Sequence, residues 1–241
     1  MKEILLIALI SVSIACKQKP KKKESRAETL TIQNEWVYLF DGVSFKGWHQ
    51  FNMTEMSEAW IIEDEAMVLP DGTGIGKGHD IVTDSEFTNF ELSIEWKISE
   101  GGNSGIFWSV VEGENYSTPY QNGPEIQVLD NKLHPDSFVR MNYHQAGALF
   151  DMVQPLSDET KPAGEWNHYL ISIDHNANKG IVILNDVEII TFPLSGSEWD
   201  ALITNSKFAT WKDFAKLKTG KIGLQDHGDG VSYRNIKIRE L

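Results

Sequence analysis

The alternation of apolar and polar residues along this chain limits it to a fold built from β-strands. Residues 90–99, "FELSIEWKIS", place Leu92, Ile94, Trp96 and Ile98 at every second position, with polar residues between them. Successive side chains of a strand point to opposite faces, so this spacing gives one apolar and one polar face. The segment is therefore predicted to be a strand with one face against a core.

The same alternation predicts at least seven strands in all, and they lie in residues 90–99, 104–111, 124–131, 167–192, 220–227 and 232–241. Residues 167–192 read as three strands, with turns at 175–180 and at Asn185-Asp186. A helical pattern is confined to about 197–216, where one or two short turns are expected. Many antiparallel strands and little helix predict an all-β jelly-roll β-sandwich with a concave sheet.

The N-terminus is predicted to be a lipoprotein signal peptide, residues 1–16. An apolar run over 4–14 is too short to cross a bilayer as a helix, and it is followed by Ala15 and Cys16, the only cysteine of the chain. A small residue before this cysteine is typical of a bacterial lipobox, so Cys16 is the predicted site of lipidation. An ordinary cleaved signal or an uncleaved anchor is the alternative. Either way we expect the folded part to be exported, and lipidation would hold it at the membrane, on the periplasmic side of the envelope or at the cell surface.

A lysine-rich segment separates this signal from the rest of the chain. Residues 17–35 are predicted to be a flexible tether, because like charges and few apolar residues do not support ordering. Residues 29–241 carry 15 basic and 32 acidic side chains, a formal charge of −17. Such a domain repels polyanions, so nucleic acid is excluded as a partner and a neutral ligand such as a sugar is favoured. No repeat or internal linker occurs, so residues 36–241 are predicted to form one domain.

Polar side chains gather on one face of two predicted strands. In 124–131, Glu125 and Gln127 share a face, and near the C-terminus Gln225 and His227 share a face with Gly223. Two long polar side chains are costly against a core but ordinary in a cleft. If both strands belong to the concave sheet, these side chains form one polar floor. The alternative is a sheet face that is simply solvated.

Other chemistry receives less support. His134, Asp136, His144 and Asp151 lie near one another in the sequence, but in none of the spacings typical of zinc sites. No nucleophile-elbow motif supports a serine triad. Jelly-roll glucanases carry a strand with paired acids, Glu-x-Asp-x-x-Glu, whereas here Gln127 stands where the second acid should be. This departure argues against ordinary retaining hydrolysis by two carboxylates.

Six segments in this order resemble the 3-keto-disaccharide hydrolase family, and the resemblance covers about residues 36–241. They are "YLFDGVSFKGW" (38–48), "GNSGIFW" (102–108), "GPEIQVLDN" (123–131), "GALFDM" (147–152), "GEWNHYLI" (164–171) and "GKIGLQDHGDGVSYRNIKIREL" (220–241). The resemblance implies a concanavalin A-like, laminarinase-type jelly roll. It also implies a glycoside or disaccharide substrate that has been oxidised at C3, and hence a sugar 3-dehydrogenase as functional partner.

A ketone at C3 explains why a second carboxylate is not needed. It makes the proton at C2 acidic, so one base can remove it and the aglycone can leave C1 by elimination. Water then adds to the glycal, which completes hydrolysis. Such a site needs a base, a donor facing the C3 oxygen and an acid for the leaving group.

Carried onto this chain, the resemblance implies Glu125 as the base and His227 as the acid or enolate stabiliser. Six further residues are expected to bind substrate or orient His227: Asn103, Gln127, Asp130, His144, Gln225 and Asp226. A divalent cation could stabilise the enolate, but the sequence identifies no ligands for one. A non-catalytic carbohydrate-binding module and a conventional endo-glucanase are the alternative functions.

Overall fold

The computed structural model describes residues 35–72 and 78–241. The described residues all belong to one compact unit. The predicted signal peptide, Cys16 and most of the tether lie outside the described residues. Within the described residues, no helix is long and apolar enough to span a bilayer.

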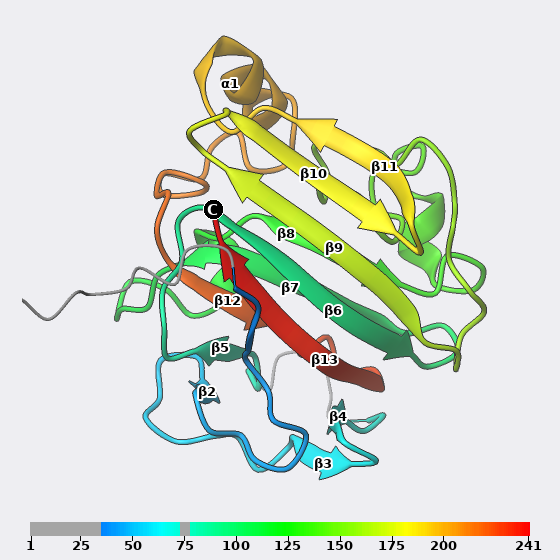
Figure 1. Cartoon of the computed structure of the whole chain (residues 1–241). Coiled ribbons are helices and arrows are strands. Elements are labelled where there is room, and N and C mark those ends of the chain that lie inside the picture. The colour runs from blue at the N-terminus through cyan, green and yellow to red at the C-terminus, as the bar shows by residue number, and fades with distance from the viewer. Residues whose placement is uncertain (1–34, 73–77) are drawn as a thin grey trace, which may run out of the picture. The chain divides into compact units, whose positions relative to one another are not determined.

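The strands form two antiparallel sheets (Figure 1). The larger has eight strands, of which seven follow the order β11 (Val187–Phe192), β10 (Lys179–Leu184), β9 (Asn167–Asp174), β6 (Phe90–Ile98), β13 (Val231–Glu240), β4 (Ala66–Leu69) and β3 (Ile61–Glu63), while β1 (Val37–Tyr38) pairs with β13. The smaller has the order β2 (Trp48–Gln50), β5 (Ile81–Thr83), β12 (Lys221–Leu224), β7 (Asn103–Val110) and β8 (Glu125–Leu129). The prediction of an all-β jelly-roll sandwich is confirmed.

Helix is scarce, as the sequence predicts. The described residues contain α1 (Gly196–Thr204) and two short 3-10 helices, η1 (Pro119–Gln121) and η2 (Pro135–Phe138). Helix α1 lies beside the ends of β10 and β11 (Figure 1). The predicted tight turn also forms, because Asn185 and Asp186 both adopt the left-handed conformation that joins β10 to β11.

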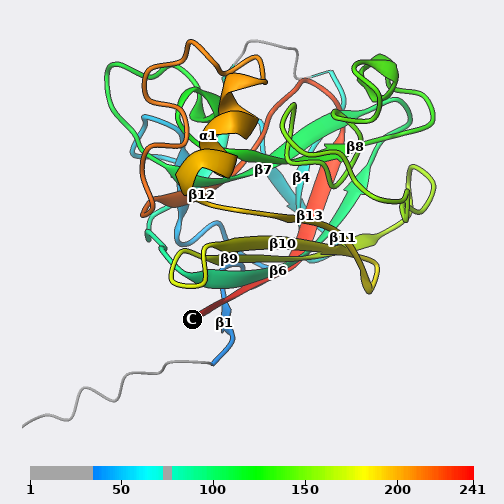
Figure 2. The same ribbon diagram turned by 90° about the horizontal axis from the view of Figure 1, so that it is seen from above.

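The core lies between the two sheets, which Figure 2 shows as separate layers. Trp96, Tyr169 and Tyr233 of the larger sheet are completely buried there. From the smaller sheet, Ile106 and Ile126 stand opposite each other in neighbouring strands and join the same apolar cluster. Alternating side chains of β7 and β8 therefore face the core, and the remaining ones face away from it.

The outer face of the smaller sheet is also largely covered. Every residue of β7 and of β8 is buried. Residues 147–150 run beside β8, where Gly147 and Phe150 donate backbone hydrogen bonds to the carbonyls of Gln127 and Glu125. This pairing continues the sheet past β8, so β8 has hydrogen-bonded neighbours along both of its edges.

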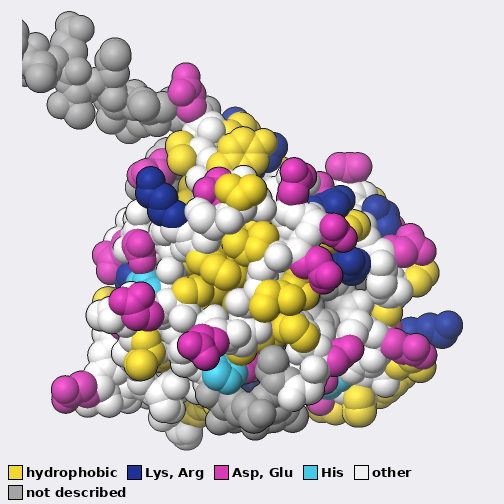
Figure 3. All heavy atoms as spheres, turned by 90° about the horizontal axis from the view of Figure 1, so that it is seen from below, with side chains coloured by type: hydrophobic (Ala, Val, Ile, Leu, Met, Phe, Trp, Pro, Cys, Tyr) yellow, Lys and Arg dark blue, Asp and Glu magenta, His cyan; other side chains and the backbone are white. Residues whose placement is uncertain are grey.

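Some apolar side chains stay exposed near the start of the domain. Val37, Tyr38, Val43, Met53 and Ile61 are exposed, between 44% and 75%. Figure 3 shows hydrophobic side chains gathered on one face of the molecule, with acidic and basic side chains around them. The apolar side chains on this face are therefore grouped and not scattered.

Candidate active site

Two strands of the smaller sheet bring the predicted polar residues together on its outer face. Glu125 and Gln127 stand on β8 opposite Phe107 and Gly105 of β7, and Asn103 follows at the next alternate position of β7. The Glu125 carboxylate lies over Gly105, where an added β-carbon would come within 2.2 Å of Oε1. Gly105 therefore makes the space that the carboxylate occupies.

Glu125 is a strongly perturbed carboxyl group. Its side chain is buried, and this burial raises the pKa to about 8, although the positive charge of Lys207 opposes the shift. The ammonium group of Lys207 lies 4.1 Å from the centre of the Phe150 ring, and burial lowers its pKa. A carboxyl group with a pKa near neutrality can take and return a proton under physiological conditions.

Two buried amides continue from Glu125 across the floor. Gln127 is completely buried, and its amide group lies between Glu125 Oε1, at 2.9 Å, and Asn103 Oδ1, at 3.3 Å. Asn103 Nδ2 in turn lies 3.4 Å from Nε2 of His227. Glu125, Gln127, Asn103 and His227 therefore form a continuous polar chain that crosses from β8 over β7 to the loop after β12.

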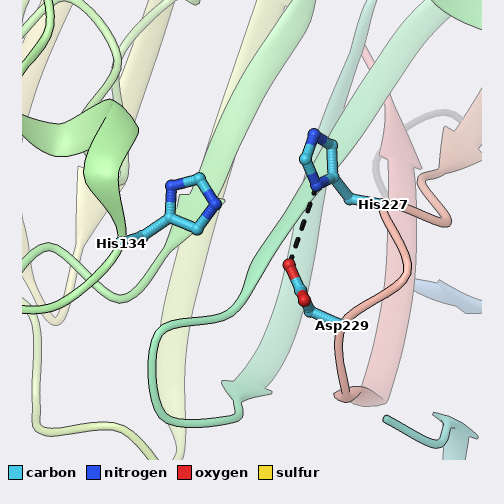
Figure 4. A group of neighbouring side chains, drawn as sticks. All are labelled: His134, His227 and Asp229. Carbon is cyan, nitrogen blue, oxygen red and sulfur yellow. Dashed lines mark ion pairs between the residues drawn. The ribbon is translucent and has the colours of Figure 1, made fainter. Parts of the chain in front are cut away.

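His227 lies at the open end of this chain, together with His134 and Asp229 (Figure 4). The His227 side chain is 30% exposed, and its Nδ1 lies 3.7 Å from Oδ2 of Asp229. The backbone N–H of Asn103 donates to the same Asp229 oxygen. His134 stands just before η2 and meets His227 edge to face, with ring centres 6.0 Å apart. The histidine side chains are therefore more accessible to a substrate than the buried carboxyl group of Glu125.

The same three residues are the candidate cation ligands among the described residues, because one ligand atom from each lies within 4.8 Å of the others. The hydrogen bonding of His134 does not suit that role. Its Nδ1 accepts the backbone N–H of Asp136, so the neutral ring carries its proton on Nε2. A metal-bound histidine instead donates from its second nitrogen. The group thus offers a cation two ready ligands, His227 and Asp229. His134 serves as a neutral donor, and burial lowers its pKa.

The predicted residues Asp226 and Asp130 hold loops in place. Asp226 accepts the backbone N–H of Gly228 and of His79. Asp130 accepts the backbone N–H of Gly101 with one oxygen and that of Lys132 with the other. Both carboxylates therefore order the turns beside the floor. Whether they also contact substrate stays a prediction.

Gln225 and His144 occupy different surroundings. Gln225 is buried at the end of β12, and its Oε1 finds no hydrogen-bond partner among the described residues. His144 stacks on Phe150, and its Nε2 pairs with Asp151 at 2.8 Å. Asp151 also pairs with Arg140 at 2.6 Å. His144 thus belongs to an ion-pair cluster, and its predicted role in substrate binding stays a prediction.

Sequence reasoning did not assign Lys207, His134 or Asp229 to the site. Lys207 follows α1, about 80 positions after Glu125 in the sequence, and no local pattern links the two. Asp229 stands two positions after His227, which is the one signal that could have indicated it. Four tryptophans do not offer an open ring to a sugar: Trp48, Trp60 and Trp108 are buried in the core, and Trp166 is covered by Arg234.

A pocket of about 570 Å³ lies at the far end of β8, lined by residues 129–133, 158 and 160–163 together with Glu100. Asp130 is the one predicted site residue in its lining. Glu125 and His227 do not line it, so the chemistry described above is not placed in this pocket.

Comparison with known proteins identifies the family. The sequence profile of the 3-keto-alpha-glucoside-1,2-lyase-like domain matches residues 35–239. The chain belongs to this family. A 3-keto-disaccharide hydrolase of Bacteroides thetaiotaomicron is 36% identical over 232 residues, which cover 86% of this chain and 78% of that protein. The match to the family agrees with the resemblance inferred from the six motifs.

Solved structures support the family fold. A crystal structure from Parabacteroides distasonis, provisionally described as a glycosyl hydrolase, has a TM-score of 0.77 at 30% identity and covers 86% of this chain and 94% of its own. A second from the same organism has a TM-score of 0.67 at 28% identity, with 86% and 100% covered. The fold of the described residues is therefore shared with these two structures.

Proposed function

We propose that this chain cleaves the glycosidic bond of 3-keto-disaccharides by elimination followed by hydration. Family membership supports the substrate class. The observation that carries the mechanism is the floor itself, where β8 presents one carboxyl group of raised pKa, Glu125, beside an amide, Gln127. Ordinary glycosidases need a pair of carboxyl groups across the scissile bond. One base is enough when a ketone at C3 already makes the C2 proton acidic.

The steps follow from that chemistry. Glu125 takes the proton from C2, and the electrons of that bond form the enolate of the C3 ketone. The enolate re-forms the ketone as the C1–O bond breaks, and the leaving oxygen receives a proton. Water then adds across the C1–C2 double bond, with its oxygen bonding to C1 and a proton returning to C2. The sum is hydrolysis of one glycosidic bond.

His227 and His134 are placed to serve the oxygens in these steps. His227 faces the open end of the site and is proposed to protonate the leaving oxygen or to hold the enolate oxygen. The Nε2–H of His134 is a neutral donor beside it. Neutral donors that are fixed before the reaction stabilise a developing oxyanion without a cost of reorganisation. Asn103, Gln127 and Gln225 complete the floor beneath the sugar.

A substrate comparison tests the proposed function. We expect the full chain to cleave 3-keto-trehalose and to cleave trehalose at least about a thousandfold more slowly, because only the ketone acidifies C2. Sugar products are followed by NMR, with and without a chelator. Equal cleavage of both sugars would contradict the proposal. A loss on chelation that a divalent cation restores would show that a cation completes the site.

The raised pKa of Glu125 predicts the pH dependence. A base must be ionised to act, so kcat/KM is expected to rise about tenfold per pH unit below a pKa of about 8 and to level off above it. The measurement is kcat/KM on 3-keto-trehalose between pH 5.5 and 9.5. A profile that is flat below pH 7.5 would show that Glu125 is not the base.

The dehydrogenase partner and the membrane anchor are also part of the proposal. A substrate oxidised at C3 requires a sugar 3-dehydrogenase that acts before this enzyme. The N-terminal sequence supports a lipoprotein that is lipidated at Cys16 and held at the outer side of a membrane. Labelling with a radioactive fatty acid, which Cys16→Ser should abolish, tests this anchoring.

A further inference from the structure

Lys207 is a cation beside Glu125 to which the proposed steps assign no role. It follows α1, and its backbone N–H donates to Oδ2 of Asp151. The next residue, Phe208, is buried and stacks on Phe214, with ring centres 3.8 Å apart. The backbone at Lys207 is therefore anchored by a carboxylate and by the buried ring that follows it.

The side chain of Lys207 reaches the edge of the sheet where Glu125 lies. Its Nζ lies 4.1 Å from the centre of the Phe150 ring, and the backbone N–H of Phe150 donates to the Glu125 carbonyl. The Phe150 ring stacks on His144 and is held in place by it. A cation over an aromatic face is attracted to it without forming a hydrogen bond. An aromatic ring, and not an ion pair, therefore places the ammonium group next to Glu125.

The N–H donors of this ammonium group are free for a ligand. No hydrogen bond or ion pair joins Nζ to another residue in the part of the chain that the structure describes. Lys207 is an exposed residue, although burial of its ammonium end lowers the pKa. The charges of Glu125, Asp151 and Asp136 oppose this shift from a distance and keep the group protonated more readily. The structure thus presents a cation with three unused donors at the site.

The proposed elimination needs a donor close to its base. Glu125 takes the proton of C2 while negative charge develops on the oxygen of C3, and these two carbon atoms are bonded to each other. Base and donor must therefore lie close together without being paired to each other. Lys207 and Glu125 meet this condition, because they interact by charge but form no ion pair. His227 lies beyond the amides of Gln127 and Asn103, so it is better placed for the leaving oxygen.

We propose that Lys207 is a catalytic residue that donates a hydrogen bond to the C3 oxygen and stabilises the enolate. When Glu125 takes the C2 proton, the electrons of the C2–H bond form the C2–C3 double bond, and the negative charge moves to the C3 oxygen. A charged donor fixed at that oxygen stabilises the charge as it develops. Lys207 keeps its proton, so the ketone re-forms as the aglycone leaves C1. This assignment rests on the proposed function and leaves protonation of the aglycone to His227.

Enolisation without cleavage tests this role. The probe is the C3 ketone of 1,5-anhydroglucitol, which has a C2 proton but no leaving group at C1. In D₂O, NMR follows the loss of the C2 proton signal in the presence of the full chain, and a sample without enzyme gives the background. We expect Lys207→Met to lower the catalysed exchange rate by about a hundredfold to a thousandfold, the usual effect of removing one oxyanion donor.

Two further variants serve as controls for Lys207→Met. Lys207→Arg keeps a charged donor and should exchange at least about tenfold faster than Lys207→Met. Lys212→Met removes an exposed lysine from the same segment and should exchange at the wild-type rate. Circular dichroism checks that each variant is folded. If Lys207→Met does not fold, Lys207→Gln, which also removes the charge, is measured in its place.

The pH profile of exchange separates hydrogen-bond donation from a simple effect of charge on the base. Burial, Asp80 and Asp136 raise the pKa of Glu125, and Lys207 lowers it. The midpoint of the profile should therefore lie near pH 8 in the wild type and in Lys207→Arg, and higher in Lys207→Met. The limiting rate at high pH, fitted to each profile, compares forms in which Glu125 is ionised. A Lys207→Met limit equal to that of the wild type would overturn the proposal, because Lys207 would then only tune the base.

Failure of this assignment and failure of the proposed function give different results. If the wild type does not catalyse exchange at C2, the proposed function fails, and the role of Lys207 fails with it. If the wild type catalyses exchange and Lys207→Met reaches the same limiting rate, the proposed function stands and the assignment of Lys207 alone is wrong.

Discussion

Replacing Glu125 by glutamine is expected to lower kcat/KM on 3-keto-trehalose at pH 8 by about a thousandfold. General base catalysis contributes roughly a hundredfold to ten-thousandfold, and an amide cannot take the C2 proton. The isosteric amide fits the space over Gly105. Steady-state rates of the variant and the wild type, measured with the same substrate, give the comparison.

The raised pKa of Glu125 also predicts how the stability of Glu125→Gln, relative to the wild type, changes with pH. The folded-state pKa of Glu125, about 8, lies above the ordinary value of 4.5. Between these values the folded state binds more protons than the unfolded state, so the contribution of Glu125 to stability falls as pH rises. Urea unfolding should therefore show the variant gaining stability relative to wild type from pH 5 to pH 8.5. If the folded variant keeps wild-type turnover, Glu125 is not the base.

Replacing His227 by glutamine is expected to lower kcat/KM by about a hundredfold to a thousandfold, because a positioned acid or donor is lost. The leaving group distinguishes the two proposed roles. If His227 protonates the leaving oxygen, a 3-keto-glucoside with a nitrophenol leaving group should recover most of the lost rate. If His227 holds the enolate oxygen, the loss should be the same for both substrates.

Gln225→Leu provides a matched control for this variant, since Gln225 comes from the same loop and strand end but is buried. We expect it to change KM more than kcat, because it is placed to bind the sugar and not to transfer a proton.

Wild-type activity of His227→Gln on both leaving groups would remove His227 from the mechanism.

Local sequence patterns predicted the parts of the fold that local contacts determine. Residues 167–192 pair with their chain neighbours through short turns, so alternation and the Asn185-Asp186 turn were sufficient. The short strands β1 to β5 were not predicted. They contain two to four residues each, and β2 and β5 join a sheet whose other strands are far away in the sequence. Such strands form because they pair with distant strands, and they are too short to show a clear alternation of apolar and polar residues.

In the candidate site, too, the residues on strands were predicted from the sequence and the residues on loops were not. Side-chain parity placed Glu125 and Gln127 on one face of β8, and it depends only on the two-residue repeat of a strand. Lys207 and His134 come from loops, whose positions parity does not determine. The complete burial of Gln127 was also not predicted, because alternation along a strand assigns a side chain to a face but does not show whether that face is covered.

Cleavage of 3-keto-trehalose in D₂O tests the central claim most directly. Elimination removes the C2 proton and hydration returns one from solvent, so the released 3-keto-glucose should carry deuterium at C2 from the first turnovers. 3-Keto-glucose incubated without enzyme corrects for exchange beside the ketone. Deuterium at C2 at the earliest times, well above this control, is the result that the account predicts. A product that keeps its original C2 hydrogen would show direct hydrolysis and contradict the account.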